Sequence, residues 1–169
     1  ILATLGVIWA ELTTSGHSVY VGRAGEPVNA IDVMGRLLDG VRDLPVSLNA
    51  AFQHSAYGDI ATPLTLNVGT IEGGDWPSSV PMSCRAGVRF SYPIGWSIAD
   101  ARRALEDHVA AAAADDPWMR DHPPSIRYHG FLAEGWDVEP DEPIVRALAD
   151  AVATETGEPA ASSPLLGAA

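Results

Sequence analysis

Residues 64–92 read LTLNVGTIEGGDWPSSVPMSCRAGVRFSY. Apolar and polar residues alternate over 64–72, which is the period of a half-buried β-strand. A second run with strand character covers 82–92, and the glycines, serines and prolines between the two runs are typical of a turn. The stretch therefore predicts an antiparallel hairpin with a long connection.

A strand followed by a helix precedes this hairpin. The strand is expected over 7–14 (VIWAELTT), where β-branched and aromatic residues are frequent. Asn29 is a good helix N-cap, and the apolar residues over 31–41 recur at helical spacing. Residues 46–63 show no clear period, so we expect a loop there with room for one helical turn.

A helix followed by a strand comes after the hairpin. Ser97 and Asp100 have the spacing of a capping box, and an apolar stripe continues to Ala112. Residues 125–132 (SIRYHGFL) then predict the fourth strand.

The predicted order of elements is β-α-β-β-α-β. This order indicates the α+β class and a ferredoxin-like two-layer sandwich, with two helices on one face of a four-stranded antiparallel sheet. An extra C-terminal helix is expected from Pro143, after an acidic linker. We expect residues 5–134 to form one domain and residues 135–169 to begin a neighbouring one.

Composition excludes several classes of function. The net charge of −12 argues against nucleic-acid binding, which needs clustered cations. No apolar stretch is long enough to cross a membrane. Cys84 is the only cysteine, which favours a reducing, cytoplasmic location. The apolar ends of the chain predict a segment of a longer protein.

The residues alone predict no catalytic centre. No histidine has a second histidine or a carboxylate at metal-ligand spacing, and no serine lies in a nucleophile elbow. Arg89 lies in the middle of a strand between two apolar residues. It needs a carboxylate partner or an anionic ligand there, unless the position is an ordinary exposed one.

Three strings resemble one known family of domains. Residues 22–31 (GRAGEPVNAI) resemble its Gly…Gly-Val-Asn-Ala-Ile string, which leads into the first helix. Residues 66–74 (LNVGTIEGG), followed by 80–81 (VP), resemble its second strand and turn, and Arg89 precedes a proline and glycine turn as in the family. In combination these strings are similar to the lid, or dimerisation, domain of the acetylornithine deacetylase and succinyl-diaminopimelate desuccinylase family.

The resemblance implies much that the residues do not show. It implies a homodimer formed through the lid and two zinc ions held in a separate catalytic domain. The substrate would be an N-acyl amino acid or a small peptide, and its amide bond would be cleaved. No metal ligands of the family occur in this chain, so it should be inactive alone and should hold no metal.

Site residues also follow from the resemblance. Tyr20 stands where the family has a histidine that reaches the partner's active site, and His17 lies three residues earlier. Ser78 takes the place of a turn asparagine, and Arg89 would bind a substrate carboxylate.

The alternatives to this function are a regulatory ferredoxin-like module that binds a small molecule and a non-catalytic family member.

Overall fold

A four-stranded antiparallel sheet forms the centre of the protein. The computed structural model describes residues 1–18 and 27–167. Strands β2 (Gly6–Ser15), β3 (Leu66–Gly73), β4 (Ser83–Tyr92) and β5 (Ser125–Ala133) lie in the order β3-β4-β2-β5. All three neighbouring pairs are antiparallel. The order along the chain and across the sheet confirms the predicted ferredoxin-like plan.

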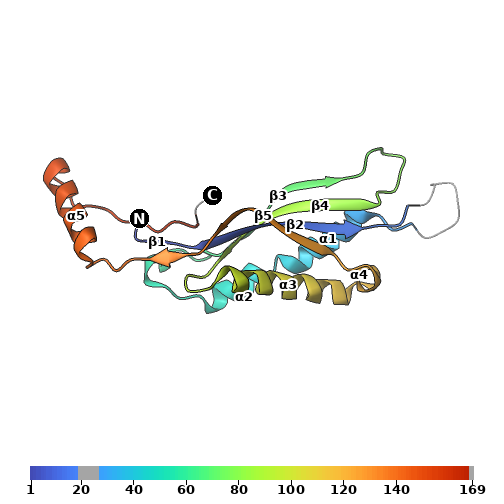
Figure 1. Ribbon diagram of the computed structural model, residues 1–169, viewed down its shortest axis with the longest axis horizontal. Helices are drawn as coiled ribbons and strands as arrows, with labels where there is room; N and C mark the ends of the chain where they lie inside the picture. Colours follow the sequence, from blue (N-terminus) through green and yellow to red (C-terminus); the bar gives the residue numbers. More distant parts are fainter. Residues whose placement is uncertain (19–26, 168–169) are drawn as a thin grey trace.

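Two long helices cover one face of this sheet (Figure 1). They are α1 (Ala30–Val41) and α3 (Ile98–Asp115). The Asn29 side chain accepts the N–H of Ile31 at the start of α1, and Ser97 and Asp100 form a complete capping box at the start of α3. Both predicted N-termini are therefore confirmed to the residue.

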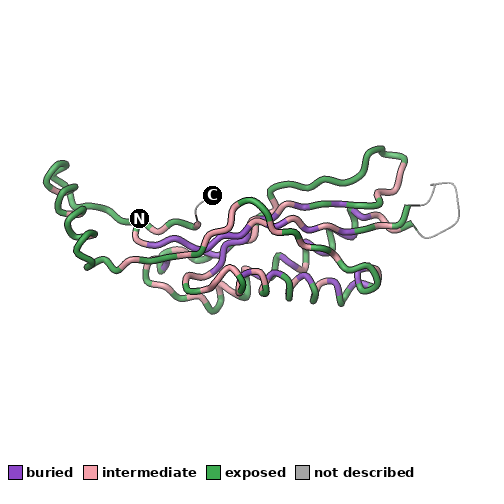
Figure 2. Tube along the Cα trace, in the orientation of Figure 1, coloured by how far each residue is buried: buried purple, intermediate pink, exposed green. Residues whose placement is uncertain are grey.

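The core lies between the sheet and these helices, as the distribution of buried residues shows (Figure 2). Successive strand residues point to opposite faces, so every second residue of β2 and β4 enters the core. The largest fully buried side chains there include Ile8, Leu12, Phe90, Tyr92, Met34, Leu37 and Leu105. The residues between them along β2 and β4 point to the opposite face, which the helices leave open.

Residues 46–63 are more regular in the structure than the predicted loop. Helix α2 (Leu44–Ala51) begins at the edge of this region, and a single 3-10 turn, η1 (Ser55–Tyr57), follows it. The Asn49 side chain fastens α2 to the chain before β3 by donating to the Leu64 oxygen and accepting the Leu64 N–H. Such a long-range contact leaves no local pattern in the sequence.

A separate two-stranded sheet and a short helix complete the fold. Strand β1 (Ala3–Thr4) pairs with β6 (Trp136–Asp137), and α4 (Pro117–Asp121) follows α3 directly. Residues 164–167 run beside β1, since the Leu165 N–H donates to the Ala3 oxygen at 2.9 Å.

The extra C-terminal helix is α5 (Pro143–Thr156), which begins at the predicted proline and ends at Gly157 in a left-handed conformation. It stands away from the sheet in Figure 1, and none of its residues is buried. None of the helices within the described ranges has the length and apolar character that crossing a bilayer requires.

Candidate functional site

Arg89 lies on the open face of the sheet. Its neighbours along β4, Val88 and Phe90, are buried in the core, so the alternation of a strand turns Arg89 away from the helices. The register places Asn67 of β3 and Trp9 of β2 directly opposite Arg89 on its two sides. A row of three different side chains therefore crosses the face from β3 to β2.

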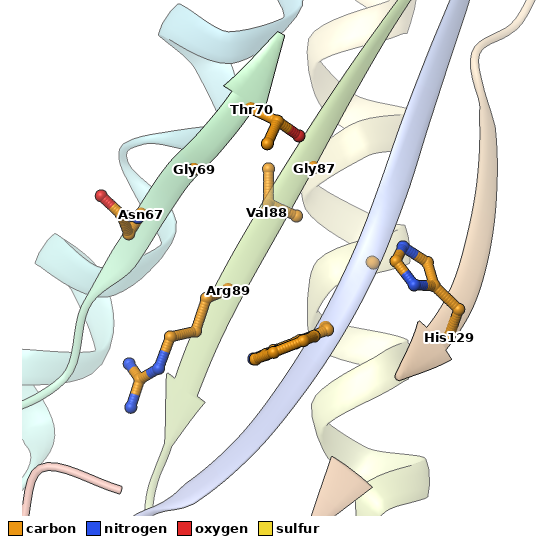
Figure 3. A pocket seen from close by; sticks show the side chains of 9 residues that line it. Asn67, Gly69, Thr70, Gly87, Val88, Arg89 and His129 are labelled. Atoms are coloured by element: carbon orange, nitrogen blue, oxygen red, sulfur yellow. The ribbon is translucent and has the colours of Figure 1, made fainter. Parts of the chain in front are cut away.

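A hollow of about 360 Å³ lies beside this row. Figure 3 shows Asn67 and Thr70 on β3, Arg89 on β4 and His129 on β5 around it. Its complete lining comprises Trp9, Ala10, Asn67, Gly69, Thr70, Gly87, Val88, Arg89 and His129. This volume is within the range of pockets that take small molecules.

Two glycines line the hollow. A Cβ atom added at Gly87 would collide with the Thr70 hydroxyl, so the Thr70 side chain lies over Gly87. A Cβ atom added at Gly69 would meet nothing nearer than Asn67 Nδ2, at 3.7 Å. Gly69 also lies at a bulge, between the paired positions Val68 and Thr70. The missing side chain at Gly69 therefore leaves open space beside the hollow.

The guanidinium of Arg89 is partly buried. Burial lowers its pKa, because removal from water disfavours the charged form. Nη2 donates to the backbone oxygens of Leu166, at 2.9 Å, and Gly167, at 3.3 Å. Within residues 1–18 and 27–167, no carboxylate forms an ion pair with Arg89. Among the described residues, neutral backbone oxygens thus hold the charge.

The other predicted site residues lie far from Arg89. The backbone of His17 pairs with that of Val28, and Ser78 is exposed in the connection between β3 and β4. The Gly16 N–H donates to the Met82 oxygen, so the segments that carry His17 and Ser78 meet at the same end of the sheet. From Ser83, at that end, to Arg89 is about 20 Å along β4. Tyr20 lies outside the described residues.

Sequence reasoning missed the neighbours of Arg89 in the hollow. Trp9, Asn67, Thr70 and His129 come from three strands that are far apart in the chain. The strand period of two places each of them on a face, but only the register brings them together. The glycines at 69 and 87 were the available signal, because a glycine inside a strand often marks a close approach or a space.

A metal centre is not built by the described residues. In that part of the chain, no three histidine, cysteine, aspartate or glutamate side chains come together in a way that suits a metal ion. His54 and Asp137 form a pair, at 3.2 Å between Nε2 and Oδ2, but a pair supplies only two ligands. These residues do not fit the two zinc ions implied by the resemblance.

Two related proteins match about two thirds of the chain. A deformylase of N-formyl-4-amino-5-aminomethyl-2-methylpyrimidine from Halalkalibacterium halodurans is 30% identical over 117 residues, which cover 69% of this chain and 27% of that protein. A protein named as a probable carboxypeptidase from Aspergillus clavatus is 33% identical over 115 residues, covering 66% of this chain and 24% of its own length. The chain thus spans about a quarter of these relatives.

Solved structures share the fold. A hydantoinase/carbamoylase family amidase from Burkholderia vietnamiensis superposes with a TM-score of 0.68 at 21% identity, covering 99% of this chain and 36% of that one. A tripeptidase from Staphylococcus aureus gives a TM-score of 0.69 at 13% identity, covering 100% of this chain and 40% of that one. At these identities the match concerns the fold alone.

The model of the peptidase dimerisation domain family matches residues 2–117. This range runs from β1 to the start of α4 and includes α1, α3, Arg89 and both glycines of the hollow. It covers more than half of the chain, and it agrees with the resemblance found in the three sequence strings. The chain belongs to the peptidase dimerisation domain family.

Proposed function

We propose that this chain is the dimerisation and substrate-covering domain of a dinuclear-zinc amidohydrolase. The whole enzyme would cleave amide bonds of N-acyl amino acids or small peptides. Residues 5–134 form the lid, and residues 135–169 begin the flanking catalytic segment. The observation that carries the proposal is the partly buried guanidinium of Arg89, which faces a hollow without a carboxylate partner among the described residues.

The zinc ions would be held by parts of the enzyme outside this chain. When bound, they would supply an activated water for attack on the amide carbonyl. The residues of this chain would bind and orient the substrate. The lone Cys84 agrees with a cytoplasmic enzyme.

Helix α5 supports the assignment of 135–169 to a flanking segment. Ile144, Leu148 and Val152 follow each other at intervals of four residues and therefore share one face of the helix. They are 73%, 65% and 37% exposed. An apolar stripe of this kind is typical of a helix that packs on another layer, and we assign that layer to the catalytic domain.

Arg89 is proposed to bind the substrate carboxylate. A guanidinium is well suited to this role, because its N–H groups match a carboxylate in a bidentate arrangement. His17 and Ser78 lie at the far end of the same sheet, so one protomer is unsuited to bring them to the carboxylate held by Arg89. We therefore assign Tyr20 or His17 to the active site of the partner, and we place Ser78 at the same shared site.

The free edge of β3 is the proposed surface for the second copy. β3 is the outermost strand of the sheet, so its outer backbone groups have no strand partner among the described elements. Ile71 at this edge is 54% exposed, and Ile31 on the adjacent α1 is 38% exposed. Pairing of two β3 edges would cover both apolar side chains and join the two sheets.

Light scattering on the chain tests the dimer. We expect a dimeric mass for the wild type and a monomeric mass for Ile71→Lys, because the new charge would be buried in the interface. Leu148→Lys, which places the same charge on exposed α5, should remain dimeric. A monomeric wild type at high concentration would contradict the dimerisation role.

Kinetics of the full-length enzyme test the site. Arg89→Gln should raise KM for an N-acyl amino acid about ten-fold or more, since a charge-assisted pair is lost. Arg42→Gln is the matched control, because its guanidinium pairs with Asp39 on the exposed surface after α1 and lies outside the lining of the hollow. An unchanged KM in Arg89→Gln would remove Arg89 from the substrate site.

A further inference from the structure

The hollow beside Arg89 has a rigid aromatic wall. The indole of Trp9 packs against the ring of Phe131, with centroids 6.2 Å apart and planes tilted by 50°. Gly130 also lies against the indole, since a Cβ atom added there would be 2.7 Å from Trp9 Cε3. The indole is therefore held from the β5 side, and it presents a fixed apolar surface to the hollow.

The floor of the hollow is formed by the backbone of β4, with the Thr70 side chain beside Gly87. Gly87 lies on β4 directly between Thr70 of β3 and Glu11 of β2. The two strands that flank β4, β3 and β2, are roughly 9–10 Å apart, which is twice the spacing of neighbouring strands. This width accepts one planar ring lying on the floor of β4, with the open position Gly69 at its side.

Charge at the hollow is asymmetric. Glu11, the nearest carboxylate along β2, is already paired with Arg127 at 3.1 Å. In the described part of the chain, the hydrogen-bond partners of Arg89 are the two carbonyls of the C-terminal run. The site thus offers one cationic end next to an apolar surface, which is the pattern expected for a ligand with one anionic group and one apolar group.

We infer that this hollow is a specificity pocket for the aromatic side chain of an N-acyl amino acid. The substrate carboxylate lies at Arg89, and the ring lies over the backbone of β4 between Gly69 and Trp9. The inference rests on the proposed function, because it uses the same contact between Arg89 and a carboxylate. It adds the class of amino acid that the enzyme prefers.

Binding of N-acetyl-L-phenylalanine and N-acetyl-L-alanine to the 169-residue chain tests this assignment. The two probes share the carboxylate and the acyl group, so the ring is the main difference between them. Titrations followed by ¹⁵N NMR, at the indole N–H of Trp9 and the backbone amide of Arg89, give both affinities and the location. We expect the phenylalanine probe to bind about ten-fold more tightly.

Gly69→Leu is the decisive variant. Gly69 lines the hollow, and an added Cβ atom there would meet nothing nearer than 3.7 Å, so we expect the new side chain to take up space in the hollow. We expect it to abolish the preference for phenylalanine and to leave the affinity for the alanine probe unchanged. Gly58→Leu is the matched control, because its nearest atom is also at 3.7 Å and it lies outside this hollow.

The outcomes separate the pocket from the proposed function. Arg89→Gln should weaken both probes by the same factor. If Gly69→Leu retains the preference, or if the wild type shows none, the pocket assignment is wrong even where Arg89 still binds both carboxylates. If Arg89→Gln changes neither affinity while the preference persists, the carboxylate role of Arg89 is wrong, and the inferred orientation of the substrate fails with it.

Discussion

Nη2 of Arg89 donates a hydrogen bond of 2.9 Å to the backbone oxygen of Leu166, which lies 77 positions later in the chain. The contact links β4 to the run that follows α5. It fixes the side chain at the rim of the hollow, because a guanidinium bound on one side has fewer conformations left to lose when an anion binds. The direction of Arg89 thus depends on a segment outside the four-stranded sheet.

Gly167→Ala should disturb this contact. Gly167 has a φ of +92°, and an added Cβ atom would lie 2.9 Å from Arg89 Nη2 and would collide with Val7. We expect the C-terminal run to detach locally. Hydrogen exchange at the Leu165 N–H, which donates to the Ala3 oxygen, measures this detachment and should become at least about ten-fold faster.

Gly157→Ala is the control for backbone strain alone. Gly157 also has a positive φ, of +75°, but no atom lies within 4 Å of an added Cβ. Exchange at the Leu165 N–H should keep its wild-type rate in this variant. Equal rates in the two variants would show that contacts of Gly167 do not hold the run in place.

Local patterns in the sequence were sufficient for most of the fold. Asn29, Ser97 and Pro143 mark the starts of three helices by their own chemistry. Strand-forming composition, and the period of two over 64–72, marked the four long strands. Helix α2 was missed because Asn49 stabilises it through Leu64, fifteen residues away. Its own residues carry only a weak helical period, and a tertiary contact decides the conformation.

The candidate site was less predictable than the fold. Arg89 could be singled out because a cation in a strand between buried residues needs an explanation. Trp9, opposite it, could not, since the register between β2 and β4 is set by the packing of both strands on the helices. The bonds from Arg89 to Leu166 and Gly167 also depend on a turn of the chain after α5, which no local pattern determines.

Asp116→Ala should destabilise the junction of α3 and α4. The buried Asp116 carboxylate accepts the N–H groups of Trp118 and Met119 and a hydrogen bond of 2.6 Å from Arg36. The loss of these bonds should lower the free energy of unfolding by about 2 kcal/mol at pH 7. Urea denaturation measures the change, and the exposed Asp115→Ala should cost less than about 0.5 kcal/mol.

This difference should depend on pH. Burial raises the pKa of Asp116, but the Arg36 and backbone hydrogen bonds outweigh burial and hold the pKa below its usual value. The charged form is therefore favoured in the folded state, and its contribution is complete above about pH 4, the unfolded value. Below that pH the gap between wild type and Asp116→Ala should shrink. A gap that stays constant down to pH 2 would contradict this role of the charge.

Tyr92→Phe should show the opposite dependence on pH. The fully buried hydroxyl donates to the Ala133 oxygen at 2.9 Å, and burial, with help from Glu134, raises the pKa of Tyr92 to about 12. At pH 8 the variant should be about 1 kcal/mol less stable, because one hydrogen bond is lost. Urea denaturation at both pH 8 and pH 11 measures how this difference changes.

The wild type should lose this advantage in alkali. An unfolded tyrosine ionises near pH 10, whereas Tyr92 in the folded state resists ionisation until about pH 12. By pH 11 the unfolded state has gained about 1.4 kcal/mol from this group, so Tyr92→Phe should equal or exceed the wild type in stability. An unchanged difference at pH 11 would mean that Tyr92 ionises equally easily in both states.

Gly130→Ala should affect the aromatic wall of the hollow. Gly130 has a φ of +69°, and its added Cβ atom would lie 2.7 Å from Trp9 Cε3. Gly95→Ala is a suitable comparison, since Gly95 has a φ of +88° and no atom within 4 Å of an added Cβ. Both variants should lose about 1 kcal/mol through backbone strain, and Gly130→Ala should lose a further 1–3 kcal/mol, roughly, from overpacking against the indole. Urea denaturation gives the two values. Equal losses would show that Trp9 yields freely to a new methyl group, and the wall would then be too mobile to select a planar ring.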